Sequence, residues 1–384
     1  MQPTSPFGSF FIGGFECSAH RRWDGVRLDL LASTGHERWA HQDYRSLRAC
    51  GIDSARDGVR WHLIEQTPGR YDWSSFLPML HAASATRMSV AWDICHYGWP
   101  DFIDIWSVGF IESIARFAAG VARIVRQESD IVPIYCAINE LSYWAWAGGE
   151  VGRIGPFARG RGAELKRQLV RAALAITEAI RDVDPRARLL YAEPAIHVAS
   201  GSSEPQHVSD AEQYRLSQFE ALDMITGSAV PELGGHPGAL DILGVNFYPD
   251  NQWYLGGSTI PLGHHAYRPF REMLTEFFQR YRRLIVVSET GAEGSARSSW
   301  LHYVCTEVRA AMSCGVPVAG LCLYPITEYW GWENERLCAA GLFSVPDERG
   351  RRVIDPDLAA ELDHQSCMFA PVHRTDDSSL RIAR

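Results

Sequence analysis

The sequence has 384 residues, of which 46% are hydrophobic and 22% are charged, an ordinary composition for a globular protein. A formal net charge of −9 leaves no basic stripe to neutralise phosphates, so we expect no nucleic-acid partner. No segment approaches roughly 18 uninterrupted apolar residues, so we expect no contact with a membrane.

The N-terminus lacks a charged segment followed by a long apolar stretch, so we expect no signal peptide. The nine cysteines form no CxxC pair and lie mostly in apolar runs, which is typical of free thiols in a reducing compartment. We therefore expect a cytoplasmic protein. The sequence gives no indication of its oligomeric state.

Short apolar runs alternate with helical patterns along the chain. The predicted strands are 10–15, 54–59, 89–94, 132–138, 188–192, 240–246, 284–288 and 318–323. The predicted helices are 38–50, 74–86, 108–128, 162–182, 211–226, 268–282 and 298–314. Eight strands separated by helices predict an α/β protein with a (β/α)8 fold, the TIM barrel.

We expect a single catalytic domain over 1–370, followed by a flexible, polar C-terminal tail over 371–384. A doubly wound sheet is the alternative, but no glycine-rich phosphate motif follows an early strand. The segments after the strands are long and rich in Trp, Tyr, His and Gly, whereas those before the strands are short. In a barrel, the segments after the strands build the catalytic face.

Two glutamates end strands on this face. Glu140 follows the fourth predicted strand in "INE", and Glu289 ends the seventh in "SETG". These strands lie on opposite sides of a barrel mouth, so the two carboxylates can face each other across a substrate. Hydrolysis of a glycosidic bond needs such a pair, one to protonate the leaving oxygen and one to attack or to activate water.

The surrounding segments are suited to a carbohydrate substrate, because aromatic rings stack on sugars and a few polar groups contact hydroxyls. The polar candidates are His96, Asn139, Asn246 and Tyr248. The tryptophans that follow strands are Trp99, Trp144, Trp146, Trp253, Trp330 and Trp332. The pair His264–His265 lacks a third ligand at suitable spacing, so we expect neither a metal nor an organic cofactor.

Several short motifs resemble those of glycoside hydrolase family 1, the β-glucosidase and β-galactosidase barrels. "GFECSAHR" (14–21) resembles GAATSAYQ, and "CHYGWP" (95–100) resembles HHWDLP. "INE", "GVNFYP" and "SETG" resemble FNEP, GxNYY and TENG. Trp332 stands nine residues before "GL" (341–342), as in the family's FEW…FGL segment. The resemblance runs from the first strand to about residue 343.

The resemblance implies a role for each matching residue. Glu140 is the expected acid/base and Glu289 the expected nucleophile. Arg56 and Tyr248 are expected to support Glu289, while His96 and Asn139 contact the sugar bound on the non-reducing side of the scissile bond, the glycone.

Other positions depart from the family pattern. Arg21 stands where the family has a glycone-binding glutamine, Gly331 where it has a glycone-binding glutamate, and Leu141 where a proline follows the acid/base. The phosphate-binding residues of the 6-phospho-glycosidases are also absent after Trp332, which argues against a 6-phosphosugar. Arg21 could meet an acidic sugar, and Glu328, Glu333 or Glu335 could meet an amino sugar.

We therefore predict a retaining β-glycosidase that acts on a β-glycoside or oligosaccharide. One alternative is a transglycosidase that uses the same residues, and another is a catalytically impaired carbohydrate-binding barrel. A metal-dependent isomerase or lyase would need three or four carboxylate or histidine ligands at strand ends, a cluster that the sequence does not offer.

Overall fold

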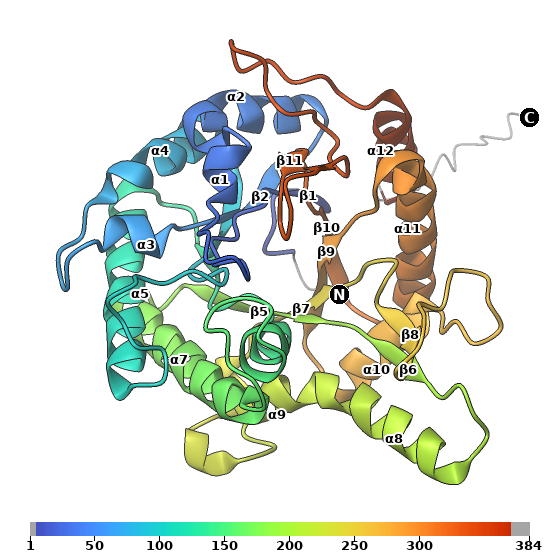
Figure 1. The fold of residues 1–384 in the computed structure, drawn as a ribbon. Helices are drawn as coiled ribbons and strands as arrows, with labels where there is room; N and C mark the ends of the chain where they lie inside the picture. Colours follow the sequence, from blue (N-terminus) through green and yellow to red (C-terminus); the bar gives the residue numbers. More distant parts are fainter. Residues whose placement is uncertain (1–4, 370–384) are drawn as a thin grey trace, which may run out of the picture.

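The computed structural model describes residues 5–369, which form one closed barrel of parallel strands with helices around it (Figure 1). The barrel strands are β1 (Phe11–Gly14), β2 (Ser54–Gly58), β3 (Ser89–Asp93), β4 (Ile134–Cys136), β5 (Arg188–Pro194), β7 (Ile242–Asn246), β9 (Leu284–Thr290) and β10 (Val318–Leu323). Each strand pairs with its neighbours in chain order, and β10 closes the barrel against β1. The fold is therefore the predicted single-domain (β/α)8 barrel.

The helices lie outside the barrel or over its mouth (Figure 1). They are α1 (Leu30–Ser33), α2 (His36–Ala49), α3 (Trp61–Ile64), α4 (Leu77–Thr86), α5 (Val108–Glu128), α6 (Leu141–Trp144), α7 (Gly162–Val183), α8 (Pro205–Leu216), α9 (Glu220–Thr226), α10 (Phe270–Tyr281), α11 (Arg297–Ser313) and α12 (Pro356–Phe369). Two small sheets, β6 (His197–Ala199) with β8 (Gln252–Tyr254) and β11 (Tyr329–Trp330) with β12 (Leu337–Cys338), form in segments that follow barrel strands.

The sequence of α5 illustrates why the outer segments form helices that pack on the barrel. The Ser107 side chain caps its N-terminus by accepting a hydrogen bond from the Phe110 N–H. Buried residues recur every three or four positions, at Phe110, Ile114, Phe117 and Val121, so that one face of the helix is apolar. This face packs on the barrel and against α7.

The strands are buried on both faces, which explains their continuous apolar runs. In β4, Ile134 and Cys136 belong to the cluster that fills the barrel, whereas Tyr135 belongs to the layer between barrel and helices. Such alternation leaves only the carboxyl ends of the strands open to ligands.

The predicted strands are confirmed to within a few residues, but one predicted helix is divided and four helices, the short α1, α3 and α6 and the longer α12, were not predicted. The segment 211–226 is not one helix, because α8 starts at Pro205 and a 3-10 turn, Ser217–Phe219, separates it from α9. Among the described residues, none of the helices has the length and hydropathy needed to cross a membrane. The predicted tail, 371–384, lies outside the described residues.

Candidate active site

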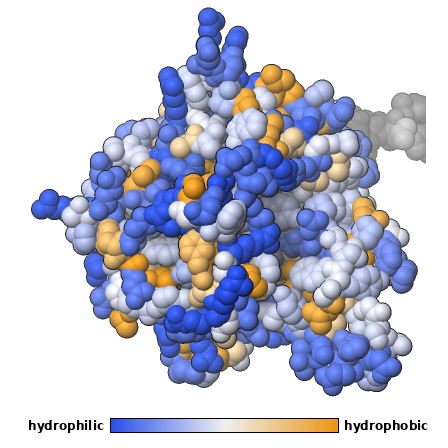
Figure 2. All heavy atoms as spheres, viewed as in Figure 1, coloured by the Kyte–Doolittle hydropathy of each residue, from blue (hydrophilic) through white to orange (hydrophobic). Residues whose placement is uncertain are grey.

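The carboxyl ends of the strands surround a cavity of about 440 Å³. Figure 2 shows this face with atoms as spheres, and hydrophilic residues border a hollow near its middle. The cavity is lined by residues that follow or end six different strands, among them Glu16 after β1, Glu140 after β4, Glu289 in β9 and Tyr324 after β10. Convergence of many strands is how a barrel assembles a site from distant parts of its sequence.

Glu289 is held by two donors. Its Oε1 accepts a hydrogen bond from Arg56 Nη1 at 2.7 Å, and its Oε2 accepts one from the Tyr248 hydroxyl at 2.9 Å. A shift in register between β7 and β9 places Asn246 beside Glu289. The side chain is 5% exposed, so its carboxylate has a fixed position at the cavity wall.

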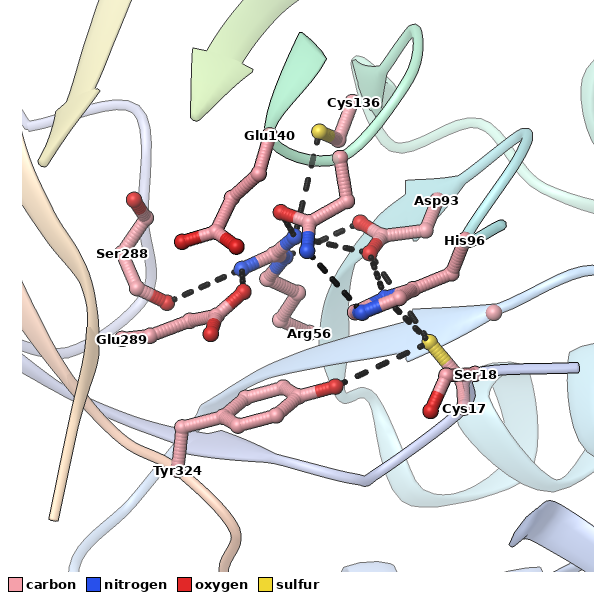
Figure 3. A network of polar contacts seen from close by, with 12 residues as sticks. Cys17, Ser18, Arg56, Asp93, His96, Cys136, Glu140, Ser288, Glu289 and Tyr324 are labelled. Atoms are coloured by element: carbon pink, nitrogen blue, oxygen red, sulfur yellow. Dashed lines mark hydrogen bonds and ion pairs between the residues drawn. The ribbon is translucent and has the colours of Figure 1, made fainter. Parts of the chain in front are cut away.

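Arg56 connects the two halves of the site (Figure 3). From β2 it donates to both carboxylate oxygens of Asp93, at 2.9 and 2.8 Å, and to Asn139 Oδ1 at 2.7 Å. Burial opposes ionisation of Asp93, but the charges and hydrogen bonds of Arg56 and His96 together outweigh burial and lower the pKa of Asp93. The guanidinium therefore fixes Glu289, Asp93 and Asn139 relative to one another.

Glu140 lies on the same side of Arg56 as Glu289 in Figure 3, and the two carboxylates face each other. Its Oε2 accepts a hydrogen bond from the Tyr97 hydroxyl at 2.8 Å, and its Oε1 accepts one from Asn246 Nδ2 at 2.9 Å. Both Glu140 and Tyr97 have positive φ, 41° and 65°. Such backbone conformations cost about 1–3 kcal/mol in residues other than glycine and cluster at functional sites.

Burial and neighbouring charges alter the protonation of Glu289. Burial raises its pKa to about 7, Arg56 opposes this rise, and the nearby Glu140 carboxylate adds to it. Near neutral pH, Glu289 can therefore be present as a carboxylate or as a carboxylic acid.

His96 and Asn139 form the floor of the cavity. Asn139 Nδ2 lies 2.9 Å from His96 Nε2, and His96 Nδ1 lies 3.0 Å from Asp93 Oδ2. If Asn139 donates to Nε2, then Nδ1 carries the proton and donates to Asp93. Burial alone would lower the pKa of His96, but the hydrogen bond to Asp93 and the charges of Glu16, Asp93 and Glu289 together raise it.

Only one group of side chains among the described residues has atoms close enough to share a metal ion. These are Cys17, Asp93 and His96, whose ligand atoms lie within 4.8 Å of one another. Both oxygens of Asp93 already accept hydrogen bonds from Arg56, and burial raises the pKa of the Cys17 thiol well above its ordinary value. A cation there would stand beside a fixed guanidinium and a protonated thiol, so the donor set does not suit a metal.

A second cavity, of about 620 Å³, adjoins the first. Glu140, Tyr143, Tyr248 and Asp250 line both. The remaining wall includes aromatic rings and two ion pairs, Arg153 with Glu333 and Lys166 with Glu220. The aromatic residues of this wall are Trp146, Tyr214 and Trp253. Glu140 therefore stands at the junction of two spaces.

The structure brings most of the predicted site residues together. Those that line the first cavity or bond to its carboxylates are Arg56, His96, Asn139, Glu140, Asn246, Tyr248, Glu289 and Trp332.

Five predicted substrate contacts, by contrast, lie outside both cavities. Arg21 pairs with Asp101, and Trp99 packs beside Trp144 along a separate depression of the surface. Trp144 is fully buried and donates its indole N–H to the Gly155 carbonyl at 2.9 Å.

The other two of these five contacts follow β10. Glu328 lies 3.5 Å from Arg297, and Trp330 is half exposed on the small sheet β11–β12. Glu335, considered for an amino sugar, pairs with Arg22 instead, whereas Glu333 reaches the second cavity.

Four residues of the site were missed. Glu16, Tyr97 and Tyr324 line the cavity, and Asp93 holds Arg56 and His96. Each is a polar side chain at or just after the end of a strand, which is the signal that identified Glu140. Glu16 was overlooked because the resembling family motif has alanine at its position.

No protein-family model and no curated protein matches the chain. Solved structures do resemble it. The AHE enzyme from Alicyclobacillus herbarius is 13% identical, with a TM-score of 0.78 over 96% of this chain and 99% of that one. A family 1 β-glucosidase from Thermotoga maritima is 13% identical, with a TM-score of 0.74 over 92% and 96%.

The virulence factor SghA from Agrobacterium tumefaciens is 15% identical, with a TM-score of 0.74 over 94% and 97% of the two chains. Another structure of SghA contains salicin, described as a substrate analogue of that protein. At these identities the comparison establishes the fold. The chain therefore has the barrel of the family 1 glycosidases, as its motifs predict, at a large sequence distance.

Proposed function

We propose that this protein is a retaining β-glycosidase, with Glu289 as nucleophile and Glu140 as acid/base. The observation that carries the proposal is the different set of partners around two carboxylates in one cavity. Glu289 accepts from a guanidinium and a phenol, whereas Glu140 accepts from a phenol and an amide. The positive charge of Arg56 opposes the rise that burial causes in the pKa of Glu289 and so stabilises the carboxylate that attacks the anomeric carbon.

The position of Glu140 between the cavities supports its role. The first cavity, which contains Glu289, His96 and Asn139, is the proposed glycone site. The second cavity, with its aromatic wall, is the proposed site of the leaving group. A carboxylic acid at their junction is placed to protonate the oxygen that joins the two parts of the substrate.

The proposed reaction has two steps. In the first, a carboxylate oxygen of Glu289 forms a bond to the anomeric carbon while the bond to the leaving oxygen breaks and Glu140 gives that oxygen its proton. In the second, Glu140 takes a proton from water, the water oxygen bonds to the anomeric carbon, and Glu289 leaves. Retention predicts that the two carboxyl groups lie about 5–5.5 Å apart, against roughly 6.5–9.5 Å for inversion.

A transglycosidase would use the same residues with a second sugar in place of water. The size and aromatic wall of the second cavity are compatible with such an acceptor. Product analysis with and without added sugar acceptors distinguishes the two, because transfer yields a longer glycoside.

Chemical rescue tests the two roles. With aryl glycosides that have an activated leaving group, E289A and E140A should both be slow and should both be accelerated by azide. Azide in E289A replaces the nucleophile and should give a glycosyl azide of inverted configuration. Azide in E140A intercepts the covalent intermediate and should give the retained configuration.

The control is E328A, which removes a glutamate that lies outside both cavities and should keep wild-type activity. Absence of rescue in both active-site variants, or inverted products from the wild-type enzyme, would contradict the assignment.

A further inference from the structure

We propose that Glu16 selects the glycone, and that this glycone carries a protonated amine. The inference rests on the proposed glycosidase function and names its substrate class. It concerns a residue that takes no part in the proposed bond-making steps.

Glu16 is a buried carboxylate with one oxygen left for a ligand. It is 4% exposed and lines the same cavity as Glu140 and Glu289. Its Oε1 accepts hydrogen bonds from the Ser18 N–H at 2.9 Å, the Ser18 hydroxyl at 2.6 Å and the Tyr324 hydroxyl at 3.3 Å. Within residues 5–369, Oε2 accepts from no donor.

This geometry indicates a missing donor. Three donors on Oε1 hold the carboxylate in one orientation. Glu16 lines the cavity, so its free carboxylate oxygen can accept a hydrogen bond from a ligand N–H or O–H. A charged donor would bind more strongly, because charge-assisted hydrogen bonds are roughly twice as strong as neutral ones.

The charge of the cavity favours a cationic donor over a hydroxyl. Five carboxylates line the cavity, and no lysine or arginine is among the lining residues. These carboxylates belong to Glu16, Glu140, Asp250, Glu289 and Glu293. Arg56, beneath the cavity, already serves Asp93 and Glu289, and Glu293 pairs with Arg336. The remaining negative charge attracts a cation and repels an acidic sugar.

The fold also explains why the carboxylate comes from this strand. After β10, Gly331 has φ +69°, and a Cβ there would lie 2.5 Å from the Asn334 carbonyl oxygen. No side chain fits at position 331 without a change of backbone, so this segment cannot supply a glycone contact at that position. Glu16, after β1, places a carboxylate in the cavity from another side.

Substrate selectivity tests the inference. The probes are aryl β-glucosides and their 2-amino-2-deoxy and 6-amino-6-deoxy analogues. At least one amino analogue should have a kcat/KM about tenfold or more above that of the neutral glucoside. E16Q keeps the shape and removes the charge, so it should lower that preference about 10- to 100-fold. D250N removes a charge from the same cavity and should keep the preference.

Calorimetric titration with the free amino sugars is the second measurement, because it does not depend on turnover. The preferred amino sugar should bind wild-type protein at least tenfold more tightly than it binds E16Q.

The outcomes separate the two proposals. Turnover of the neutral glucoside at a kcat/KM equal to or above that of both amino analogues would overturn the amine and leave the glycosidase standing. Equal effects of E16Q and D250N on selectivity would overturn the specific role of Glu16. Binding that depends on Glu16 without turnover of any glycoside would support Glu16 and overturn hydrolysis, and neither binding nor turnover would overturn both.

Discussion

Two networks of charged side chains are buried in this barrel, and they differ in whether they face a cavity. One centres on Arg56 and opens at Glu140, Glu289 and Glu16 into the cavity at the barrel mouth. The other centres on His36 at the start of α2. It links His36 to Asp43 and Asp57, at 2.8 Å each, and Asp43 in turn accepts hydrogen bonds from Arg352.

The His36 network is closed. Asp57 also accepts from the Tyr44 hydroxyl and from the Gly58 N–H, so both of its oxygens have donors. Burial alone would lower the pKa of His36, but Asp57 and Asp43 outweigh burial and raise it to about 9. The network connects α2, β2 and the segment before α12, which is a structural role.

The comparison shows that burial of charge does not by itself indicate function. Both networks contain buried carboxylates and a buried cation. They differ in whether polar atoms remain for a ligand. In the Arg56 network, moreover, a carboxyl group, that of Glu289, has a raised pKa. Carboxylates without a cationic partner destabilise the folded protein. Their presence at a cavity is therefore typical of a site whose interactions are completed by a bound substrate.

The largest expected effect is a loss of catalysis when a carboxylate of the Arg56 network is replaced. E289Q should lower kcat/KM for aryl glycosides by about 10⁴- to 10⁶-fold, since it removes the nucleophile.

The same substitution should also change stability. Because the folded-state pKa of Glu289 is raised, its ionised form destabilises the fold as pH rises toward and past 7. E289Q should therefore melt a few degrees higher than wild type at pH 8. Steady-state kinetics and calorimetry check both parts, and a stable variant with wild-type activity would contradict them.

The next effect is on stability through the closed network. H36Q should lower the free energy of unfolding by about 3–5 kcal/mol, because it leaves the buried Asp57 without a cationic partner and Asp43 with Arg352 alone. The pKa of His36 is raised, so its contribution is full below pH 6.5 and is lost as pH rises through about 9. The deficit of H36Q should thus shrink between pH 6 and pH 9.5 in denaturant titrations. A loss of activity without a loss of stability would contradict a structural role.

A smaller effect concerns Glu193, which belongs to neither network. It is fully buried behind Glu140 and accepts from the Ser142 N–H, with no cationic partner among the described residues. Burial raises its pKa to about 8, although the Ser142 hydrogen bond opposes the rise. Its stabilising protonated form is lost as pH rises from about 4.5 through 8. Between pH 5 and pH 9, the free energy of unfolding of E193Q should rise by about 2–4 kcal/mol relative to that of the wild type. Denaturant titrations at several pH values measure this, and parallel pH profiles for the two proteins would refute it.

The smallest effect tests the placement of Arg21. R21A should keep kcat/KM within about twofold of wild type, because Arg21 pairs with Asp101 outside both cavities. H96A, which changes the cavity floor, should lose about 100-fold or more under the same conditions. A large loss in R21A would show that the segment around Arg21 moves into the site when substrate binds.

The sequence was sufficient for the barrel and for its strand-end residues. Barrel strands are buried on both faces, and their carboxyl ends meet at one rim of the barrel. A polar residue after an apolar run therefore marks the end of a strand and is expected at the catalytic face. Glu140, Glu289, Asn246 and Tyr248 were predicted by that logic, whereas Arg56 was predicted from the resemblance to glycoside hydrolase family 1. Together these residues span more than 200 residues of chain.

The long segments between strands and helices were not predictable in the same way. They have no regular alternation of apolar and polar residues. The sequence therefore could not predict where the side chains of Arg21, Trp144 and Trp330 point. Trp144, for example, follows Glu140 by four residues but points into the core, because α6 turns its side chain toward Gly155. The acidic character of the cavity also emerged only from the structure, since its carboxylates come from distant strands.

The most direct test of the central claim is to trap the covalent intermediate. Wild-type protein is incubated with 2-deoxy-2-fluoro glycosides that have an activated leaving group, over a panel of neutral, acidic and amino sugars. Intact mass spectrometry and peptide mapping then locate any adduct. The account predicts one glycosyl group, bound to Glu289. An adduct on Glu140 or on another residue, or turnover of the panel without any adduct, would contradict it.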